Sequence, residues 1–151
     1  MVVNVIIGWV LPWLVGSFFI RKDKFVFLHI GPFASVIAFI FDEIGHHMRW
    51  WSITPAGAGI LAFIPYNLGV FPVISCLLLY TVRRSSVNPW LLIPLFSTGK
   101  TMFELSLVLA GKVTYDRGWN IGWTYVSYVL ACSLCYGWYR CFWSRGINQG
   151  N

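Results

Sequence analysis

The chain has 151 residues, of which 58% are hydrophobic, 19% aromatic and only 11% charged, and its formal net charge is +6. So small a polar fraction cannot cover a soluble domain, and the mean hydropathy of +0.68 indicates an integral membrane protein whose first partner is the lipid bilayer. The basic residues are scattered singly or in pairs. Nucleic-acid-binding proteins gather them into one patch, so we exclude nucleic acid as a partner.

Five apolar segments follow one another along the chain, each close to the ~20 residues that a helix needs to cross the hydrocarbon core. They cover residues 2–20, 25–41, 56–80, 90–111 and 121–143. The third contains Pro65 and Pro72, and a proline inside a helix removes a backbone hydrogen bond. The sequence therefore predicts a single integral membrane domain over residues 1–151. We expect an all-α bundle of five transmembrane helices, with the third helix kinked at Pro65.

Basic residues divide unevenly between the two ends of these helices. One end has seven, namely Arg21, Lys22, Lys24, Arg83, Arg84, Arg140 and Arg145, and the other has three, namely Arg49, Lys112 and Arg117. Cytoplasmic loops carry the excess of lysine and arginine, so we expect the N-terminus outside and the C-terminus in the cytoplasm. The first segment has basic residues after it and none before it, which is typical of a retained signal anchor.

Lys100 and Glu104 lie in the middle of the fourth segment, at the i,i+4 spacing that places two side chains on one helix face. A single charge at that depth is disfavoured by about 2.5–3.5 kcal/mol on insertion scales, so such residues usually face a protein interior or a wet cavity. We expect Lys100 to neutralise Glu104. Two interpretations stay open: a buried ion pair that only locks the helices in register, and a working site.

Two loops predicted on the outer side carry most of the remaining polar chemistry. Their candidate residues are Asp42, His46, His47, Trp50 and Trp51 after the second segment, and Asp116 and Trp119 after the fourth. Glu104 lies about two helical turns below the second of these loops. We therefore expect one outward-open cavity to gather Asp42, His46, Glu104 and Asp116. In simpler interpretations Asp116 is a solvated loop residue and Trp119 an interface anchor.

Tyr66 and Asn67 follow Pro65 at the expected kink. The Asn67 amide suits the capping of backbone groups that the proline frees. Both side chains are also candidate ligand-binding groups at the centre of the bundle.

No metal or cofactor is predicted. His46 and His47 are adjacent, so on a helix they point about 100° apart, and no HExxH motif accompanies them. Cys132 and Cys135 form a CxxC inside an apolar segment, where we interpret them as packing residues rather than as ligands or a redox pair.

Six short strings spread over most of the chain are Pro12-Trp13, Phe41-Asp42 leading to Trp50-Trp51, residues 64–72, Phe103-Glu104, residues 111–115 and Gly118-Trp119-Asn120. Together they resemble a family of small multi-pass membrane proteins of endospore-forming Bacillota. The resemblance implies a fold, and a location in the bacterial cytoplasmic membrane. It implies no particular chemistry.

A second pattern is the order of Asp42, then Trp50 or Trp51, then Pro65. It resembles the lycopene cyclase domain, in which small membrane helices carry an aspartate, a downstream tryptophan, and a proline followed by paired glutamates. Here Tyr66-Asn67 and Pro72-Val73 stand where the paired glutamates belong. Protonation of a polyene requires an acid held neutral in an apolar pocket, so on this resemblance Glu104 would have to serve.

The leading functional hypothesis is non-enzymatic. On it, the protein is a small accessory or sensory membrane protein whose outward-facing polar pocket serves another membrane protein or a lipidic ligand. The alternative is a membrane-embedded enzyme acting on an isoprenoid or lipid substrate. Glu104 or Asp42 would then be the catalytic proton donor, and Trp50, Trp51 and Tyr66 would shield a cationic intermediate by cation–π contact.

A third hypothesis is proton- or ion-coupled transport. Lys100, Glu104 and His29 would form the relay, because ionisable residues inside a membrane commonly mark ion pathways. For His29, a hydrogen bond to a neighbouring helix is the simpler role.

Overall fold

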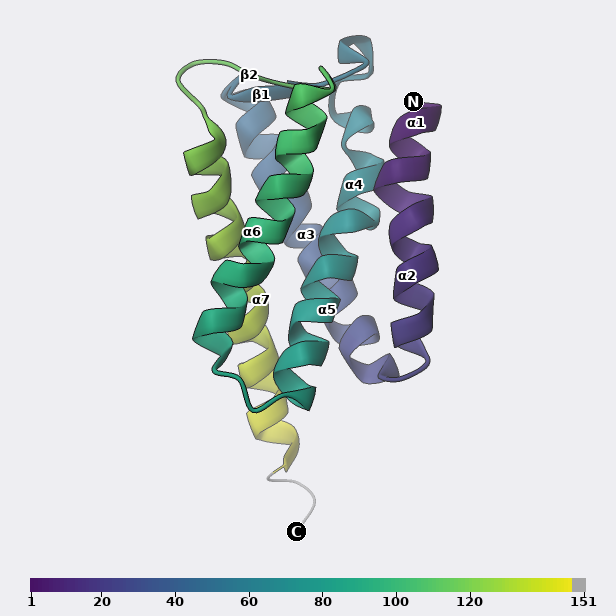
Figure 1. The fold of residues 1–151 in the computed structure, drawn as a ribbon, viewed down its shortest axis with the longest axis vertical. Coiled ribbons are helices and arrows are strands. Elements are labelled where there is room, and N and C mark those ends of the chain that lie inside the picture. The colour runs from purple at the N-terminus through teal and green to yellow at the C-terminus, as the bar shows by residue number, and fades with distance from the viewer. Residues whose placement is uncertain (148–151) are drawn as a thin grey trace.

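The computed structural model describes residues 1–147 and shows five helical segments packed side by side, with a short two-stranded ribbon across one end (Figure 1). This confirms the predicted all-α bundle of five helices. Four segments are long and apolar enough to cross a membrane, namely Val2–Ile20, Lys24–His47, Ala56–Arg84 and Pro89–Leu109. The fifth, Ile121–Ile147, has 27 residues and packs along the same bundle. At 1.5 Å per residue it exceeds a hydrocarbon core of about 30 Å.

The first segment is one continuous helix, made of α1 (Val2–Val5), a π-helical turn (Ile6–Val10) and α2 (Leu11–Ile20). A tight turn follows it. The Asp23 carboxylate then caps α3 (Lys24–His47) by accepting a hydrogen bond from the Val26 amide over 3.3 Å. This cap satisfies a backbone donor that the helix itself leaves unpaired.

α3 continues past residue 41, where the sequence predicted the end of the second helix. No proline interrupts residues 42–47, and Gly45 packs closely against Trp51, since a Cβ at Gly45 would lie 2.0 Å from the indole ring. Asp42, His46 and His47 are therefore helical residues, and the prediction that they lie in a loop is wrong. The extension places Asp42 inside the bundle.

The third segment is broken into a 3-10 helix (Ala56–Ala62), α4 (Ile64–Leu68) and α5 (Val70–Arg84). Pro65 is the second residue of α4 and lies in its first turn, where its missing amide hydrogen removes no helical bond. The backbone leaves helical geometry at Gly69, with φ −127° and ψ −84°. A Cβ at Gly69 would lie 2.0 Å from the Gly8 carbonyl oxygen. The expected interruption is present, and it includes a glycine because the first helix packs against the chain there.

The last two helices are α6 (Pro89–Leu109) and α7 (Ile121–Ile147). The Asn88 side chain accepts from the Trp90 amide over 2.9 Å, and the Asn120 side chain accepts from the Gly122 amide, also over 2.9 Å. Asparagine is among the strongest N-capping residues. Both helices therefore begin at positions that their sequences specify locally.

Two strands, β1 (Trp51–Ile53) and β2 (Val113–Tyr115), pair antiparallel, with Trp51 opposite Tyr115 and Ile53 opposite Val113. The sequence predicted only loops here. The pairing joins the segment after α3 to the segment after α6, so the two loops form one β-ribbon.

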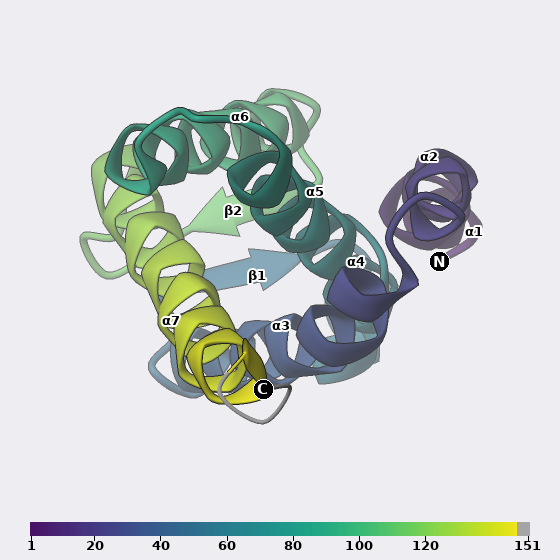
Figure 2. The ribbon, with the colours of Figure 1, turned by 90° about the horizontal axis from the view of Figure 1, so that it is seen from below.

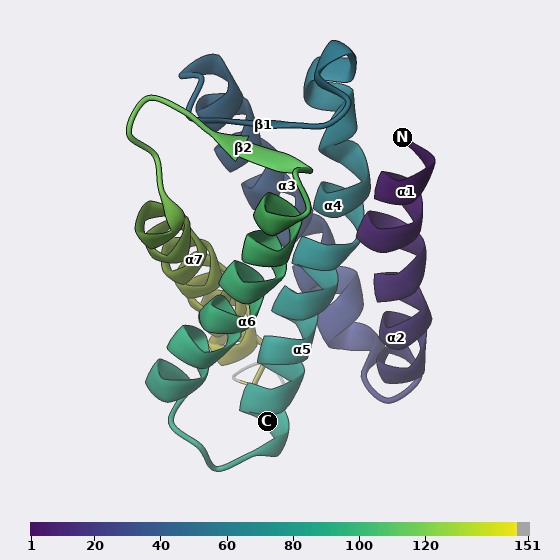
Figure 3. The same cartoon turned by 45° about the horizontal axis from the view of Figure 1, so that its top comes forward.

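Four helices surround the interior of the bundle. α3, α5, α6 and α7 form a ring in which each packs against two neighbours (Figure 2). α1 and α2 lie outside this ring, mainly against α4 and α5. The tilted view places the β-ribbon across one end of the ring (Figure 3). The ring and the ribbon together define an enclosed space.

Large apolar side chains cover the outside of the bundle. Leu109 is 81% exposed, and Val2, Leu28, Leu91 and Leu95 are also strongly exposed. Apolar surface of this extent suits contact with lipid rather than water. Together with the long apolar helices, it supports the prediction of a multi-pass membrane protein.

Candidate functional site

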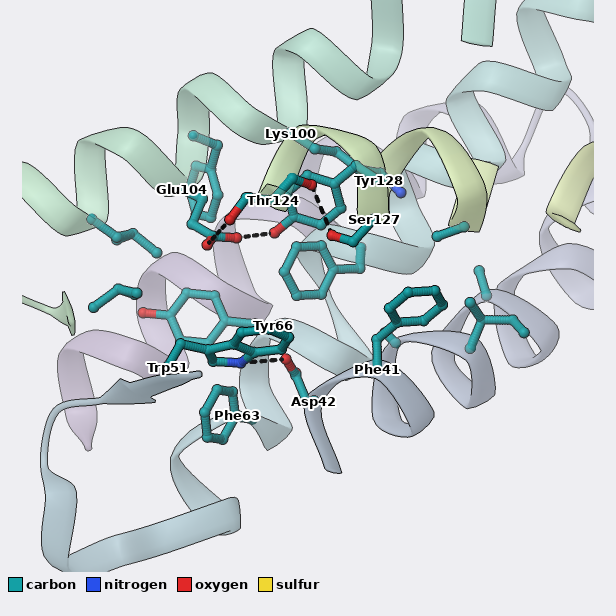
Figure 4. A pocket seen from close by; sticks show the side chains of 18 of the residues that line it. Phe41, Asp42, Trp51, Phe63, Tyr66, Lys100, Glu104, Thr124, Ser127 and Tyr128 are labelled. Atoms are coloured by element: carbon teal, nitrogen blue, oxygen red, sulfur yellow. Dashed lines mark hydrogen bonds between the residues drawn. The ribbon is translucent and has the colours of Figure 1, made fainter. Parts of the chain in front are cut away.

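A pocket with a cavity volume of about 70 Å³ lies inside the helix ring beneath the β-ribbon. Eight of its 22 lining residues are aromatic, namely Phe41, Trp51, Phe63, Tyr66, Phe71, Phe103, Trp119 and Tyr128. Asp42, Lys100 and Glu104 are its charged lining residues (Figure 4). The pocket thus brings Asp42 of α3 to the two charged residues of α6.

Glu104 is held by hydroxyl groups. Its Oε1 atom accepts from Tyr115 over 2.5 Å and from Thr124 over 3.3 Å, and its Oε2 atom accepts from Tyr128. The Trp119 indole in turn donates to the Thr124 hydroxyl over 2.9 Å. These donors come from β2, α7 and the loop between them. We call Glu104, Tyr115, Thr124 and Tyr128 the Glu104 wall.

Tyr115 is the group of the Glu104 wall that lies outside the membrane-spanning helices. Burial raises the pKa of its phenol above the ordinary tyrosine value, and the negative charge of Glu104 raises it further. Tyr115 therefore remains a neutral hydrogen-bond donor toward Glu104. The bond ties the β-ribbon to α6.

Lys100 is only 2% exposed and donates to the Ser75 hydroxyl of α5 over 2.9 Å. Within residues 1–147 it makes no ion pair with Glu104, so the expected neutralising pair is wrong. The physical reason is competition: three hydroxyl donors already occupy the Glu104 carboxylate, and the lysine instead reaches across to the neighbouring helix.

Asp42 has far fewer partners. The Trp51 indole donates to its Oδ1 atom over 3.3 Å, while its Oδ2 atom is shielded from solvent and has no hydrogen-bond partner in the described part of the chain. The Tyr66 hydroxyl and both polar atoms of the Asn67 amide are likewise buried and unpartnered among these residues. We call Asp42, Trp51, Tyr66 and Asn67 the Asp42 wall.

The two walls face each other. In Figure 4, the Asp42–Trp51 pair lies on one side of the pocket and Glu104 with Thr124 and Tyr128 lies on the other. Both carboxyl groups line one cavity with a single lysine. Such a site combines an apolar enclosure with a few polar groups, which is the usual composition of small-molecule pockets.

Tryptophans pack together above the pocket. The Trp119 ring stacks on Trp50 with centroids 4.8 Å apart and contacts Trp51 at 4.7 Å. Trp51 and Trp119 also line the pocket, whereas Trp50 backs them from outside. The predicted binding residues Trp51 and Trp119 thus both line the pocket, and Trp50 packs behind them.

Other predicted site residues lie elsewhere. His46 packs edge-on against Phe63 with ring centroids 5.9 Å apart, and His47 is exposed. Asp116 is exposed and accepts from the Arg117 amide over 2.7 Å. Neither His46 nor Asp116 lines the pocket, so the expected cavity with all four residues is wrong for these two. Asp42 and Glu104 do meet there.

His29 lies outside the pocket as well. Its Nδ1 atom is 2.9 Å from the Phe25 carbonyl oxygen of the preceding turn, its ring stacks on Phe25, and the side chain is exposed on the bundle surface. The expected relay with Lys100 and Glu104 is therefore not assembled, and neither is the expected hydrogen bond to another helix.

Sequence reasoning missed the hydroxyl groups that hold Glu104. Thr124 and Tyr128 are four residues apart on α7, and Cys135 follows two turns later on the same buried side. The spacing of these residues, which places them on one face of a helix, was the signal available in the sequence. It was obscured because tyrosine and threonine are unremarkable in an aromatic membrane helix.

Among the described residues, no cluster of three or more histidine, cysteine or acidic side chains is arranged to hold a metal ion. Cys132 and Cys135 are both buried and free, and Cys132 belongs to the cluster that fills the lower bundle. Comparisons with family models, curated proteins and solved structures gave no match to this chain. The resemblances to the Bacillota family and to the lycopene cyclase domain therefore stay predictions.

Proposed function

We propose that the protein is a small membrane-embedded binding protein with an accessory or sensory role, and that a lipidic ligand occupies the pocket beneath the β-ribbon. The observation that carries the proposal is the Asp42 wall, where the Asp42 Oδ2 atom and the Tyr66 hydroxyl belong to pocket-lining residues and are buried without hydrogen-bond partners within 3.5 Å among the described residues. Buried polar groups are nearly always hydrogen-bonded, because an unpaired one costs about 1–3 kcal/mol. Two of them together beside a pocket favour a site that a ligand completes.

The pocket also favours an apolar ligand body. Eight of its 22 lining residues are aromatic, and it lies within helices whose outer surface suits lipid. Apolar enclosure supplies affinity, and a few polar groups fix the orientation of the ligand. A molecule with one polar head and a lipid-soluble body fits this division.

Charge supports an N-out, C-in orientation in the bacterial cytoplasmic membrane. The segments at the end opposite the β-ribbon carry Arg21, Lys22, Lys24, Arg83, Arg84 and Arg140, whereas those at the ribbon end carry Arg49, Lys112 and Arg117. Arg83, a member of the first group, forms an ion pair with Asp23 in which Nη1 and Oδ2 are 2.6 Å apart. Under the positive-inside rule, the pocket then lies in the outer half of the membrane.

Photolabelling tests the proposed function. A neutral, diazirine-bearing hexadecanol is added to the protein in phosphatidylcholine nanodiscs, and cross-linked peptides are mapped by mass spectrometry. We expect labels on pocket residues such as Ser127 and Phe103 besides those on lipid-facing positions, which serve as an internal standard. Labelling confined to the lipid-facing positions would overturn the proposal.

A matched pair of α3 variants sharpens the test. Ala38 lines the pocket, and Ile40, two residues on, is 48% exposed. Ala38→Trp fills the cavity and is expected to abolish the internal labels, whereas Ile40→Trp leaves them unchanged. Equal internal labelling in the two variants would show that the probe does not enter the pocket.

A second candidate function is acid catalysis on an isoprenoid substrate, and the unpartnered Oδ2 atom of Asp42 favours it. Phe41, Trp51 and Trp119 line the same cavity and would stabilise a carbocation by cation–π contact. Co-expression with a polyene-producing pathway tests it. A new cyclic product that disappears in Asp42→Asn would support catalysis, and an unchanged product profile would exclude it for that substrate.

A further inference from the structure

We infer that the pocket selects a lipophilic cation, meaning a molecule with a positively charged centre and an apolar body. The inference rests on the proposed function and specifies its ligand. Its starting point is the charge of the lining, which has two carboxyl groups, Asp42 and Glu104, against one ammonium group, Lys100.

Hydroxyl groups compensate Glu104 and leave Asp42 uncompensated. Three hydroxyl donors surround Glu104 and suit an ionised carboxylate. Lys100 donates to the Ser75 hydroxyl and forms an ion pair with neither carboxyl group. The Asp42 carboxylate therefore has no positive partner among residues 1–147.

Asp42 is also the acid with an open coordination position. Its Oδ1 atom receives the Trp51 indole, and no hydrogen bond of 3.5 Å or less reaches its Oδ2 atom from the described residues, although the Asn67 amide lies near the carboxyl group. Tyr66, which is 2% exposed and lines the pocket beside it, has an unpartnered hydroxyl as well. A bare carboxylate in an apolar enclosure is strongly unfavourable and favours the protonated acid, so a cation placed here would replace that proton and pair with the carboxylate.

The aromatic wall suits the same cation. Phe41, Trp51, Phe63 and Trp119 all line the cavity that contains Asp42. A cation within about 6 Å of such ring faces gains roughly 0.5–2 kcal/mol per contact, most when water is excluded. Aromatic rings beside one carboxylate favour a diffuse, weakly hydrated cation with apolar substituents over a small hydrated ion.

Anionic and neutral ligands fit the site less well. An anion would meet two carboxyl groups, and its only cationic partner in the lining would be Lys100, which already donates to Ser75. A neutral ligand would occupy the apolar space and give Asp42 no cationic partner. The lining therefore predicts an order of affinity in which the cation comes first, the neutral molecule second and the anion last.

Three probes of similar size test this order: tetraphenylphosphonium, triphenylphosphine oxide and tetraphenylborate. Binding to the protein in phosphatidylcholine nanodiscs is measured by competition with the internal photolabels, with empty nanodiscs correcting for partition into lipid. We expect tetraphenylphosphonium to compete at a concentration about tenfold below that of the neutral oxide, and tetraphenylborate not to compete. Competition by the cation no stronger than by the oxide would overturn the inference.

Asp42→Asn and Glu43→Gln provide a matched pair on neighbouring positions. Asp42 lines the pocket, and Glu43 is exposed outside it. We expect Asp42→Asn to remove the preference for the cation and Glu43→Gln to retain it. A preserved preference in a folded Asp42→Asn protein would also overturn the inference. If this variant does not fold, the probe comparison on the unmodified protein still decides whether the pocket prefers the cation.

The two proposals fail separately. Internal photolabels without a preference for the cation would leave the binding function in place and remove only the inference about charge. If the internal labels were absent altogether, the proposed function itself would be lost.

Discussion

Two carboxyl groups face each other across one pocket, and their surroundings differ. Glu104 accepts hydrogen bonds from Tyr115, Thr124 and Tyr128, which join α6 to β2 and α7. Asp42 accepts one bond, from Trp51, and keeps one oxygen unpartnered among the described residues. A saturated carboxylate holds structural elements together, whereas an unsaturated one has room for a ligand. Glu104 is thus suited to holding the bundle together, and Asp42 is suited to binding a ligand in the same cavity.

Removing each carboxyl group in turn tests whether Glu104 and Asp42 have different roles. Glu104→Ala leaves the Tyr115 and Tyr128 hydroxyls without their acceptor, whereas Thr124 can still donate to the Tyr115 oxygen over 3.0 Å. We expect the free energy of unfolding to fall by about 4 kcal/mol, since each unpaired buried group costs roughly 1–3 kcal/mol. Asp42→Asn is expected to change it by less than about 1 kcal/mol, because only one weak bond depends on the group. Unfolding in mixed micelles with increasing sodium dodecyl sulfate measures both.

Glu43→Ala is the control for this pair, because Glu43 is an exposed acid on α3. A change within about 0.5 kcal/mol is expected there. Equal losses in Glu104→Ala and Asp42→Asn would contradict the division into a structural wall and a binding wall.

A smaller effect is expected when only one bond of the Glu104 wall is cut. Tyr115→Phe removes the hydroxyl that joins β2 to Glu104. Hydrogen bonds to charged groups contribute about 1.5–3 kcal/mol, so we expect a loss of about 2 kcal/mol in the free energy of unfolding. Tyr125→Phe on α7 is the control, and no loss is expected. A Tyr115→Phe protein as stable as the unmodified one would show that the ribbon does not depend on this bond.

The Tyr115 phenol also gives this bond a pH dependence. Its pKa is raised in the folded protein by burial and by Glu104. A raised pKa means that the neutral form is preferred on folding, so this contribution to stability is complete below the unfolded pKa of about 10 and declines above it. We therefore expect the stability difference between the unmodified protein and Tyr115→Phe to shrink only in alkaline solution. A difference that already declines at neutral pH would contradict this assignment.

The number and order of the helices could be predicted from the sequence because each depends on local composition. The first helix was predicted with the bounds that α1 and α2 show, and the starts of α6 and α7 follow from the capping side chains of Asn88 and Asn120. The β-ribbon could not be predicted in this way. It pairs Trp51 with Tyr115 across 64 positions of the chain, and no local pattern specifies such a pairing.

The candidate site was only half predictable for a related reason. Asp42 and Glu104 are visible in the sequence as charges in or beside apolar segments, which is a local signal. Which groups surround each of them depends on helix packing. Thr124 and Tyr128 face Glu104 because α7 packs against α6, and Lys100 meets Ser75 because α5 packs on the other side of α6. The sequence therefore indicated the charges but paired them wrongly.

Lys100→Met gives the smallest expected effect and tests that pairing directly. If Lys100 and Glu104 formed a buried ion pair that locks the helices, removing one partner would cost about 3–5 kcal/mol. Lys100 instead donates one bond to Ser75, whose own hydroxyl hydrogen remains bonded to the Phe71 carbonyl oxygen after the change. We therefore expect a loss below about 1 kcal/mol, close to the value of one ordinary hydrogen bond. The same unfolding assay measures it, with Lys112→Met in the β-ribbon loop as the control. A loss of the larger size would restore the ion pair as the main partner of Glu104.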